Sequence, residues 1–188
     1  MEMRKPELGR RYTYSDYCTW GDDERWELID GVPYNMSPAP TNAHQSISMS
    51  LSREFGVYLK GKACKVFHAP FDVRLNFDKG DDTVVQPDLS VICDPKKLEN
   101  GKGCKGAPDL VIEILSPSTT KRDKMIKFNK YLDAGVREYW IVDGEVGLIE
   151  VYTLKDGAYQ TAVFGDDGVI SVGIFDDLEI SLVDIFAV

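Results

Sequence analysis

The sequence lacks any apolar run of the roughly 18 to 20 residues that a transmembrane helix requires. Its first residues, MEMRKPELGRRYTYSDY, include basic clusters but no apolar stretch behind them, so we expect no secretory signal peptide. The four cysteines, at positions 18, 64, 93 and 104, form no CxxC pair and have no histidine at zinc-ligand spacing. These absences predict a cytoplasmic protein with reduced thiols and no structural zinc site.

Internal repeats and low-complexity tracts are also missing, which excludes solenoid and disordered classes. The 188 residues are 43% hydrophobic and 28% charged, the composition of an ordinary globular protein. A chain of this length can bury one substantial core without disulfides or structural metals. We therefore expect a single domain over residues 1–188.

Positive charge is scarce overall, and the formal net charge is -9. This balance argues against a general nucleic-acid coat, because sequence-independent DNA binding depends on Lys and Arg. Residues 96–130 differ, with nine positive and four negative side chains, whereas the remainder has 13 positive and 27 negative. Such a segment can steer an anionic substrate to one face of the protein. The alternative is that these lysines are solvated surface charges.

The first sixty residues predict a short helix, a β-hairpin and a long helix. Thr13 is a suitable N-cap for the short helix, which Gly21 would end. Two β-prone runs flank Asp30-Gly31, which is a strong hairpin signal. Between positions 41 and 60 apolar residues fall four apart, which indicates an amphipathic helix. These residues are Ile47, Leu51, Phe55 and Leu59.

The remaining sequence predicts strands interrupted by one main helix. The strand-like runs are KVFHA, FDVRLNF, QPDLSVI, PDLVIEIL, EYWIVD, GLIEVYTL, AYQTAVF, GVISVG and DLEIS. A helix is expected from about Thr120 to Ala134, closed by Gly135, and a brief one at LVDIF. Segment 94–107 has the composition of a loop. The pattern favours the α/β (α+β) class, with one mixed β-sheet flanked by helices and with N-terminal and C-terminal hairpin additions.

Two carboxylates stand out, Asp88 in Gln-Pro-Asp and Glu113 in Ile-Glu-Ile. Glu113 lies inside an apolar strand-like run, where an ionised carboxylate is costly unless it is paired or binds a metal. Carboxylates suit Mg²⁺, which usually takes one or two of them together with waters and phosphate oxygens. On neighbouring strands, about 5 Å apart, the two residues could share one ion.

Asp109 competes with Asp88 as the partner of Glu113, since it too follows a proline. Residues 109 and 113 are four apart on one strand, so their Cα atoms are about 13 Å apart and they cannot share a metal. We therefore expect Asp88 to be the partner and Asp109 to mark the start of the strand.

A lysine is expected near such a pair, to polarise water or to stabilise charge on a phosphate. Two positions after Glu113 on the same strand face stands Leu115, which cannot do this. The following helix can supply the lysine, because Asp123, Lys127 and Tyr131 recur four apart on one face. A lysine facing the sheet would be desolvated unless it met carboxylates, and Lys127 is the best placed.

The sequence resembles the Uma-type putative restriction endonucleases of the PD-(D/E)xK nuclease superfamily. The resemblance runs across nearly the whole chain. Its motifs are WELIDGVPYNMSPAP with His44 shortly after, QPDLSVI, PDLVIEILSPST, DKMIKFNKY and AGVREYWIVD. It implies a restriction-endonuclease-like core.

The resemblance also implies roles for particular residues. Asp88 and Glu113 would be the metal-binding carboxylates, and Lys127 would replace the usual strand lysine. Glu27 matches an acidic residue that often assists the metal from an early element. The chain departs from the general superfamily pattern at Leu115, where a lysine is usual.

Three further residues have weaker grounds. His44 stands at the start of the long helix, where it could contact phosphate or cap the helix. Asp123 could orient Lys127 or stabilise the first helical turn through the helix dipole. The backbone carbonyl of Ile114 would complete the metal ligands with the two carboxylates. His68 is expected to be a strand residue without chemistry, and Tyr139 and Trp140 to belong to the core.

Three functions therefore stay open. The first is a Mg²⁺-dependent endonuclease acting on DNA, with Mn²⁺ as a possible substitute and a homodimer as the expected assembly. The second is an inactive nuclease-fold module that binds or interacts. The third is a hydrolase of another phosphodiester, which the same residues would serve.

Overall fold

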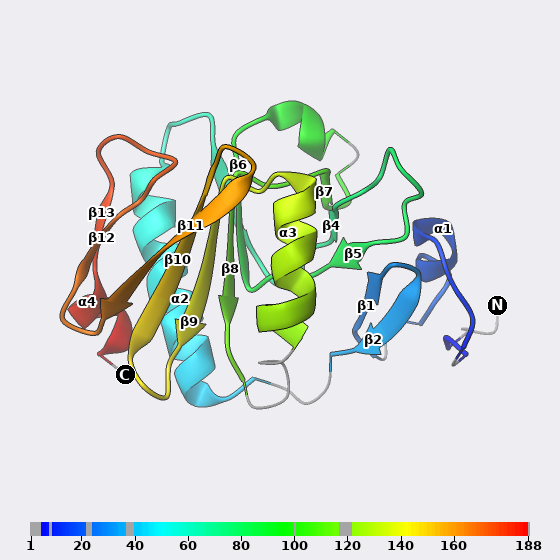
Figure 1. Ribbon diagram of the computed structural model, residues 1–188, viewed down its shortest axis with the longest axis horizontal. Helices are drawn as coiled ribbons and strands as arrows, with labels where there is room; N and C mark the ends of the chain where they lie inside the picture. Colours follow the sequence, from blue (N-terminus) through cyan, green and yellow to red (C-terminus); the bar gives the residue numbers. More distant parts are fainter. Residues whose placement is uncertain are drawn as a thin grey trace.

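A computed structural model describes residues 5–7, 9–21, 24–36, 40–99, 101–116 and 122–187, with the backbone alone placed at residues 122 and 123. Its α-helices are α1 (Tyr14–Tyr17), α2 (Asn42–Tyr58), α3 (Phe128–Ala134) and α4 (Leu182–Phe186). A 3-10 turn, η1 (Pro95–Leu98), and a π-helical turn, η2 (Arg122–Lys127), accompany them (Figure 1). The strands are β1 (Trp26–Ile29), β2 (Val32–Asn35), β3 (Lys65–His68), β4 (Val73–Arg74), β5 (Val84–Val85), β6 (Leu89–Ile92), β7 (Cys104–Lys105), β8 (Leu110–Ile114), β9 (Glu138–Asp143), β10 (Leu148–Lys155), β11 (Ala158–Gly165), β12 (Val169–Ser171) and β13 (Glu179–Ser181).

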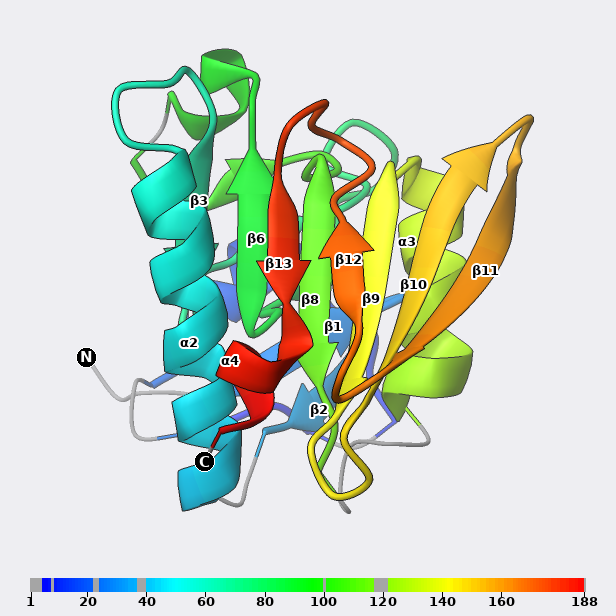
Figure 2. The ribbon, with the colours of Figure 1, turned by 90° about the vertical axis from the view of Figure 1, so that its left-hand side faces the viewer.

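A six-stranded sheet with the order β11-β10-β9-β8-β6-β3 lies between the two longest helices. The sheet is mixed, because β8 and β9 are parallel whereas its other neighbouring pairs are antiparallel. Helix α2 covers one face and α3 the other (Figure 1, Figure 2). The β12–β13 hairpin and α4 lie on the α2 side (Figure 2). The predicted sheet flanked by helices is thus confirmed for these six strands.

A second sheet has five strands in the order β2-β1-β5-β4-β7, and β12 and β13 form a third. The prediction of one mixed sheet is therefore wrong. The chain leaves the second sheet after β5 and enters the six-stranded sheet at β6, and the residues between are Gln86, Pro87 and Asp88. Pro87 has no N–H to donate to a strand ladder, so pairing breaks at this point. Asp88 is thereby placed where the two sheets meet.

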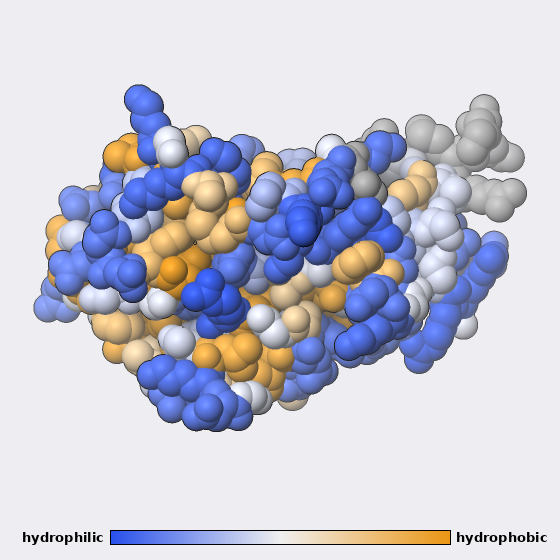
Figure 3. All heavy atoms as spheres, turned by 90° about the horizontal axis from the view of Figure 1, so that it is seen from above, coloured by the Kyte–Doolittle hydropathy of each residue, from blue (hydrophilic) through white to orange (hydrophobic). Residues whose placement is uncertain are grey.

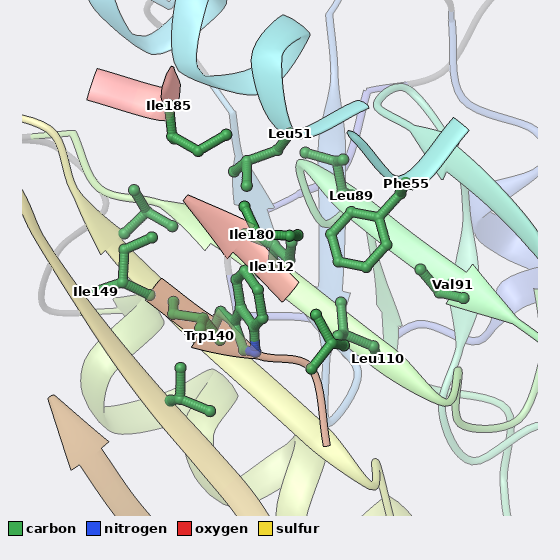
Figure 4. Packing of buried hydrophobic residues seen from close by; sticks show 14 of the residues in the cluster. Leu51, Phe55, Leu89, Val91, Leu110, Ile112, Trp140, Ile149, Ile180 and Ile185 are labelled. Atoms are coloured by element: carbon green, nitrogen blue, oxygen red, sulfur yellow. The ribbon is translucent and has the colours of Figure 1, made fainter. Parts of the chain in front are cut away.

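The core on the α2 side is apolar. The residues at four-residue spacing in α2, Ile47, Leu51 and Phe55, are fully buried, as the sequence predicts. Figure 4 shows Leu51 and Phe55 directed towards Leu89, Ile112 and Trp140 of the sheet. The rings of Phe55 and Trp140 lie 5.9 Å apart between centroids. Full burial of such side chains is worth roughly 1.5–3 kcal/mol each.

Strand β8 divides its side chains between the two faces of the sheet. Leu110, Ile112 and Ile114 belong to the α2-side core, whereas Val111 belongs to the core beneath α3. Because side chains alternate along a strand, Glu113 is directed to the same side as Val111. The only carboxylate in β8 therefore faces the helix that follows it.

The helix predicted from Thr120 to Ala134 begins, within the described residues, as the π-helical turn η2 and continues as α3. It ends at Gly135, whose φ of +83° is the left-handed conformation expected of a helix-terminating glycine. Lys127 is the last residue of η2 and precedes α3. π-Helical turns are rare and occur frequently at functional sites.

Other differences from the predicted elements are local. Helix α1 ends at Tyr17 rather than at Gly21. The run FDVRLNF supplies only the two-residue strand β4, and segment 94–107, predicted as a loop, contains η1 and β7. Strands of two residues are too short to show a period of two, so the sequence pattern does not reveal them.

The thiol prediction is wrong for two cysteines. Cys64 and Cys93 form a disulfide, and their Cα atoms are 3.9 Å apart. The antiparallel register pairs Lys65 with Ile92, so the residues just outside that pair face each other across β3 and β6. Cys18 is free and exposed, and Cys104 is free and buried.

The outer surface seen in Figure 3 is mainly hydrophilic, with separate apolar patches between polar residues. Among the helices of the described ranges, none has the length and low polarity needed to cross a membrane.

Candidate active site

Asp88 and Glu113 lie across from each other where β6 begins and β8 ends. The register pairs Leu89 with Ile112, so the next pair outward is Asp88 with Glu113. The carboxylate Oδ2 of Asp88 accepts a hydrogen bond of 2.8 Å from the backbone N–H of Ile114. This bond fixes Asp88 against the strand that carries Glu113.

Lys127 is buried between two glutamates. Its Nζ lies 2.9 Å from Oε1 of Glu113 and 2.7 Å from Oε1 of Glu27. The exposed fractions are 1% for Lys127, 4% for Glu113 and 0% for Glu27. An ammonium group so far from water is tolerated only with opposite charges and hydrogen bonds around it. Lys127, on the face of the helix that is directed to the sheet, is thus paired with carboxylates.

Tyr131 is a member of this cluster to which the sequence analysis gave no role. Its hydroxyl donates a hydrogen bond of 2.6 Å to Oε1 of Glu113. Burial, and then the nearby charge of Glu113, raise the pKa of the Tyr131 hydroxyl well above 10.0, so it stays protonated and remains a donor. Its spacing of four from Lys127 was the available signal, because both side chains share one helical face.

Glu27 reaches the cluster from the other sheet. It lies in β1, and its Oε1 accepts a hydrogen bond of 2.9 Å from the backbone N–H of Gln86 as well as the contact from Lys127. Gln86 follows β5 and begins the Gln-Pro-Asp crossing. The cluster therefore joins β1, the crossing between the sheets, β8 and η2.

His44 approaches Asp88 from α2. Its backbone N–H donates to Oγ1 of Thr41 at 3.2 Å, so Thr41 caps the helix. The ring Nε2 lies 3.2 Å from Oδ2 of Asp88, with 13% of the His44 side chain and 20% of the Asp88 side chain exposed. The sequence offered two roles for His44, a phosphate contact or a helix cap. The structure gives the cap to Thr41 and shows a different contact for the His44 ring, with the candidate metal ligand Asp88. The side chain of Asp123 lies outside the described residues.

Asp109 lies at the other end of β8, away from the cluster. Its carboxylate accepts hydrogen bonds from the backbone N–H of Cys93 at 2.8 Å and from Nη1 of Arg137 at 3.1 Å. These contacts give it a structural role at the start of the strand. Leu115 packs in the core beneath α3. His68 lies in β3, where its ring Nδ1 is 2.8 Å from the carbonyl oxygen of Ala69.

The chemistry of the donor set suits a divalent cation. Asp88, Glu113 and Glu27 contribute carboxylates, and the ammonium group of Lys127 contacts the last two. Carboxylate oxygens are the ligands that hard divalent cations prefer. Across the described ranges, no three His, Cys, Asp or Glu side chains cluster tightly enough to hold an ion by themselves. The fitting ion is therefore one that accepts two protein carboxylates and keeps waters, as Mg²⁺ does.

Comparisons with known proteins bear on the family and the fold of the chain. A solved structure of a putative nuclease of the DUF820 group from Anabaena variabilis superposes with a TM-score of 0.73 at 25% identity, covering 94% of this chain and 98% of that one. An uncharacterized protein of Synechocystis, slr1290, is 30% identical over 144 residues, which are 75% of this chain and 73% of its own length. The fold is restriction-endonuclease-like. The model of the Uma2 family, described as putative restriction endonuclease, matches residues 12–183, and the chain belongs to this family.

Proposed function

We propose that the protein is a Mg²⁺-dependent endonuclease that hydrolyses phosphodiester bonds in DNA. The observation that carries the proposal is Lys127, buried between Glu113 and Glu27, while Asp88, just before β6, accepts a hydrogen bond from the residue that follows Glu113. Carboxylates on adjacent strands with an ammonium group beside them are the parts that phosphodiester hydrolysis uses. Membership of a family described as putative restriction endonucleases supports the same reaction class.

The metal would be held by the carboxylates of Asp88 and Glu113 and by the backbone carbonyl of Ile114. When bound, Mg²⁺ supplies a water of lowered pKa and neutralises charge on the phosphate. Mn²⁺ prefers similar oxygen ligands and is expected to substitute. Glu27, on the far side of Lys127 from Glu113, would act on a metal-bound water rather than as a primary ligand.

The ammonium group of Lys127 would contact the phosphate of the substrate. Its ammonium is fixed by Glu113 and Glu27, so little reorganisation is required when charge develops on the phosphate. Tyr131 keeps Glu113 oriented through the hydrogen bond that its hydroxyl donates. Lys127, from the helix, would thereby serve the role of the strand lysine usually found two residues after the glutamate.

His44 would act as a positioning residue for Asp88. The imidazole Nε2 and the backbone N–H of Ile114 both contact Oδ2 of Asp88, which leaves the other oxygen of this carboxylate for the metal. Both contacts restrict the rotation of the Asp88 side chain. Preorganised ligands of this kind strengthen metal binding.

The test is DNA cleavage by matched variants. Asp88→Asn and Glu113→Gln each keep a hydrogen-bond acceptor but remove the carboxylate charge, so we expect them to fold and to lose Mg²⁺-dependent cleavage of plasmid and single-stranded DNA. Asp133→Asn, at an exposed residue of α3, is the control and should cleave as the parent does. Cleavage by Asp88→Asn at the parent rate would overturn the proposal.

Homodimerisation and a single domain over residues 1–188 stay predictions. A nuclease that cuts both strands of a duplex needs two sites, and an isologous dimer is the simplest way to supply them. Sedimentation equilibrium should then give twice the chain mass of 21.1 kDa. A purely monomeric species at working concentrations would contradict the dimer.

A further inference from the structure

An open pocket of about 880 Å³ lies beside the crossing between the two sheets. Its size falls within the range typical of sites for small ligands. Segments from α1, the start of β1, β3, the residues before β4 and the loop before β7 contribute to its wall. The aromatic lining residues are Tyr14, Tyr17, Trp20, Trp26, Phe67 and Phe71.

These rings are half-buried, unlike the fully buried Tyr139 and Trp140 of the core. Phe67 and Phe71 stack with centroids 4.3 Å apart and 11° between their planes. Trp20 meets Tyr17 at 5.3 Å and Trp26 at 6.1 Å in tilted and edge-on contacts. Rings held by one another in a pocket wall offer flat apolar surface at little further loss of side-chain freedom.

Gln86 connects the pocket to the carboxylate cluster. Its side-chain Oε1 accepts hydrogen bonds from Nε and Nη2 of Arg25, at 3.0 and 2.8 Å. The Nε2 group donates to Tyr17 and Asp72, at 3.0 and 2.9 Å. The backbone N–H of the same residue bonds Glu27. Asp88 is two residues further on, a span of at most about 7 Å along the chain.

The charges of the lining fit a phosphate at the rim. Arg25 and Lys102 are exposed cations of the pocket wall. Among the described lining residues, the two acidic ones are already engaged, since Glu24 pairs with Lys5 at 2.7 Å and Asp72 accepts from Tyr17 and Gln86. Aromatic platforms combined with cations are the recurrent means of binding unpaired nucleotides, because a base stacks while its phosphate meets a cation.

We propose that this pocket binds an unpaired nucleotide of DNA, with its base against the Phe67–Phe71 wall and its phosphate near Arg25 and Lys102. The identity of the ligand rests on the proposed nuclease function, and the inference deepens that function by naming the substrate class. A base within a duplex is hidden in the stack and cannot enter such a pocket. The substrate is therefore single-stranded or locally unpaired DNA.

The test measures binding without cleavage. A fluorescently labelled single-stranded oligodeoxythymidylate is titrated with the full chain in EDTA, and anisotropy gives the dissociation constant at several salt concentrations. Phe71→Leu keeps apolar volume but removes the ring, and Phe77→Leu, at an exposed phenylalanine outside this pocket, is the matched control. Circular dichroism and thermal melts establish that each variant is folded.

We expect Phe71→Leu to weaken binding about 5- to 150-fold, the range of a lost base–aromatic stack, with the salt dependence unchanged. Arg25→Gln should weaken binding and lower the slope of log K against log salt by about 0.7, the value for one phosphate contact on a single strand. Phe77→Leu should bind as the parent does.

Equal binding by Phe71→Leu and Phe77→Leu would overturn the pocket inference. So would unlabelled duplex DNA that competes for the labelled strand as well as unlabelled single-stranded DNA does. Because no metal is present, this result is separate from the fate of the nuclease proposal. Cleavage of duplex DNA without single-strand binding would contradict the pocket inference and support the nuclease proposal. Binding through Phe71 without any metal-dependent cleavage would support the pocket inference and contradict the nuclease proposal.

Discussion

Two glutamates are buried on neighbouring parallel strands, and their partners differ in charge. Glu113 in β8 contacts the ammonium of Lys127 and the hydroxyl of Tyr131. Glu138, at the start of β9, accepts hydrogen bonds from the indole of Trp140 at 2.7 Å and from the backbone N–H of Ile174 at 2.9 Å. One carboxylate is matched by a cation and the other by neutral donors.

Burial raises the pKa of Glu138 above its ordinary value of 4.5. The hydrogen bonds from Trp140, Ile174 and Gly173 and the charge of Arg137 oppose that rise. Glu138 thus ties the segment after β12 to the sheet as a structural group. Burial alone does not mark a candidate site carboxylate. Glu113 differs from Glu138 because Lys127, Glu27 and Asp88 lie close to it.

The largest expected effect on stability comes from removing the cation. Lys127→Met would remove the ammonium group that pairs with the buried carboxylates of Glu113 and Glu27, which should cost about 3–5 kcal/mol in the free energy of unfolding. Urea denaturation measures this value. Lys124→Met is the control, because Lys124 pairs with Glu150 at the surface, and its loss should cost less than about 1 kcal/mol. Equal small effects of the two variants would mean that the buried pair is not formed.

A smaller loss is expected from the hydroxyl that supports Glu113. Tyr131→Phe removes a hydrogen bond to a charged group, which should cost about 1.5–3 kcal/mol. Tyr159→Phe removes a bond of 2.9 Å to the backbone carbonyl of Val136, a neutral acceptor, and should cost about 0.5–1.5 kcal/mol. Denaturation of both variants side by side gives the difference. A greater loss for Tyr159→Phe would contradict the view that the bond to Glu113 is the stronger of the two.

The smallest effect concerns pH and the other glutamate. Because the folded pKa of Glu138 is raised, the folded state binds this proton more tightly than the unfolded state does. Stability should therefore fall as the pH rises from about 4.5 through the folded pKa, by at most about 1.4 kcal/mol per pH unit for one proton. Glu138→Gln should flatten the unfolding free energy over this window, whereas Glu145→Gln, at an exposed residue, should not. Parallel pH profiles of parent and Glu138→Gln would contradict the assignment.

The cluster around Glu113 could be predicted in part because its signals are local. A glutamate within an apolar strand demands a partner, and the next helix presents Lys127 and Tyr131 four apart. The contact between Glu27 and Gln86 joins β1 to the crossing that follows β5, over 59 residues of sequence, and no periodicity encodes it. The same holds for Glu138, whose backbone donor comes from 36 residues further on.

The fold shows a similar division between local and distant signals. Long elements such as α2, β8 and the β10–β11 hairpin follow from apolar spacing and turn residues. Two-residue strands such as β5 leave no such trace, and the division into separate sheets was missed for that reason. The bond between Cys64 and Cys93 depends on how β3 pairs with β6, which the spacing of the cysteines does not reveal.

The central claim is that Asp88 and Glu113 share one divalent cation, and diffraction from a crystal soaked in Mn²⁺ tests it most directly. We predict an anomalous peak within coordination distance of both carboxylates, and its loss in a crystal of Asp88→Asn. A saturating soak that leaves these carboxylates without a peak, or a peak that persists in Asp88→Asn, would contradict the claim.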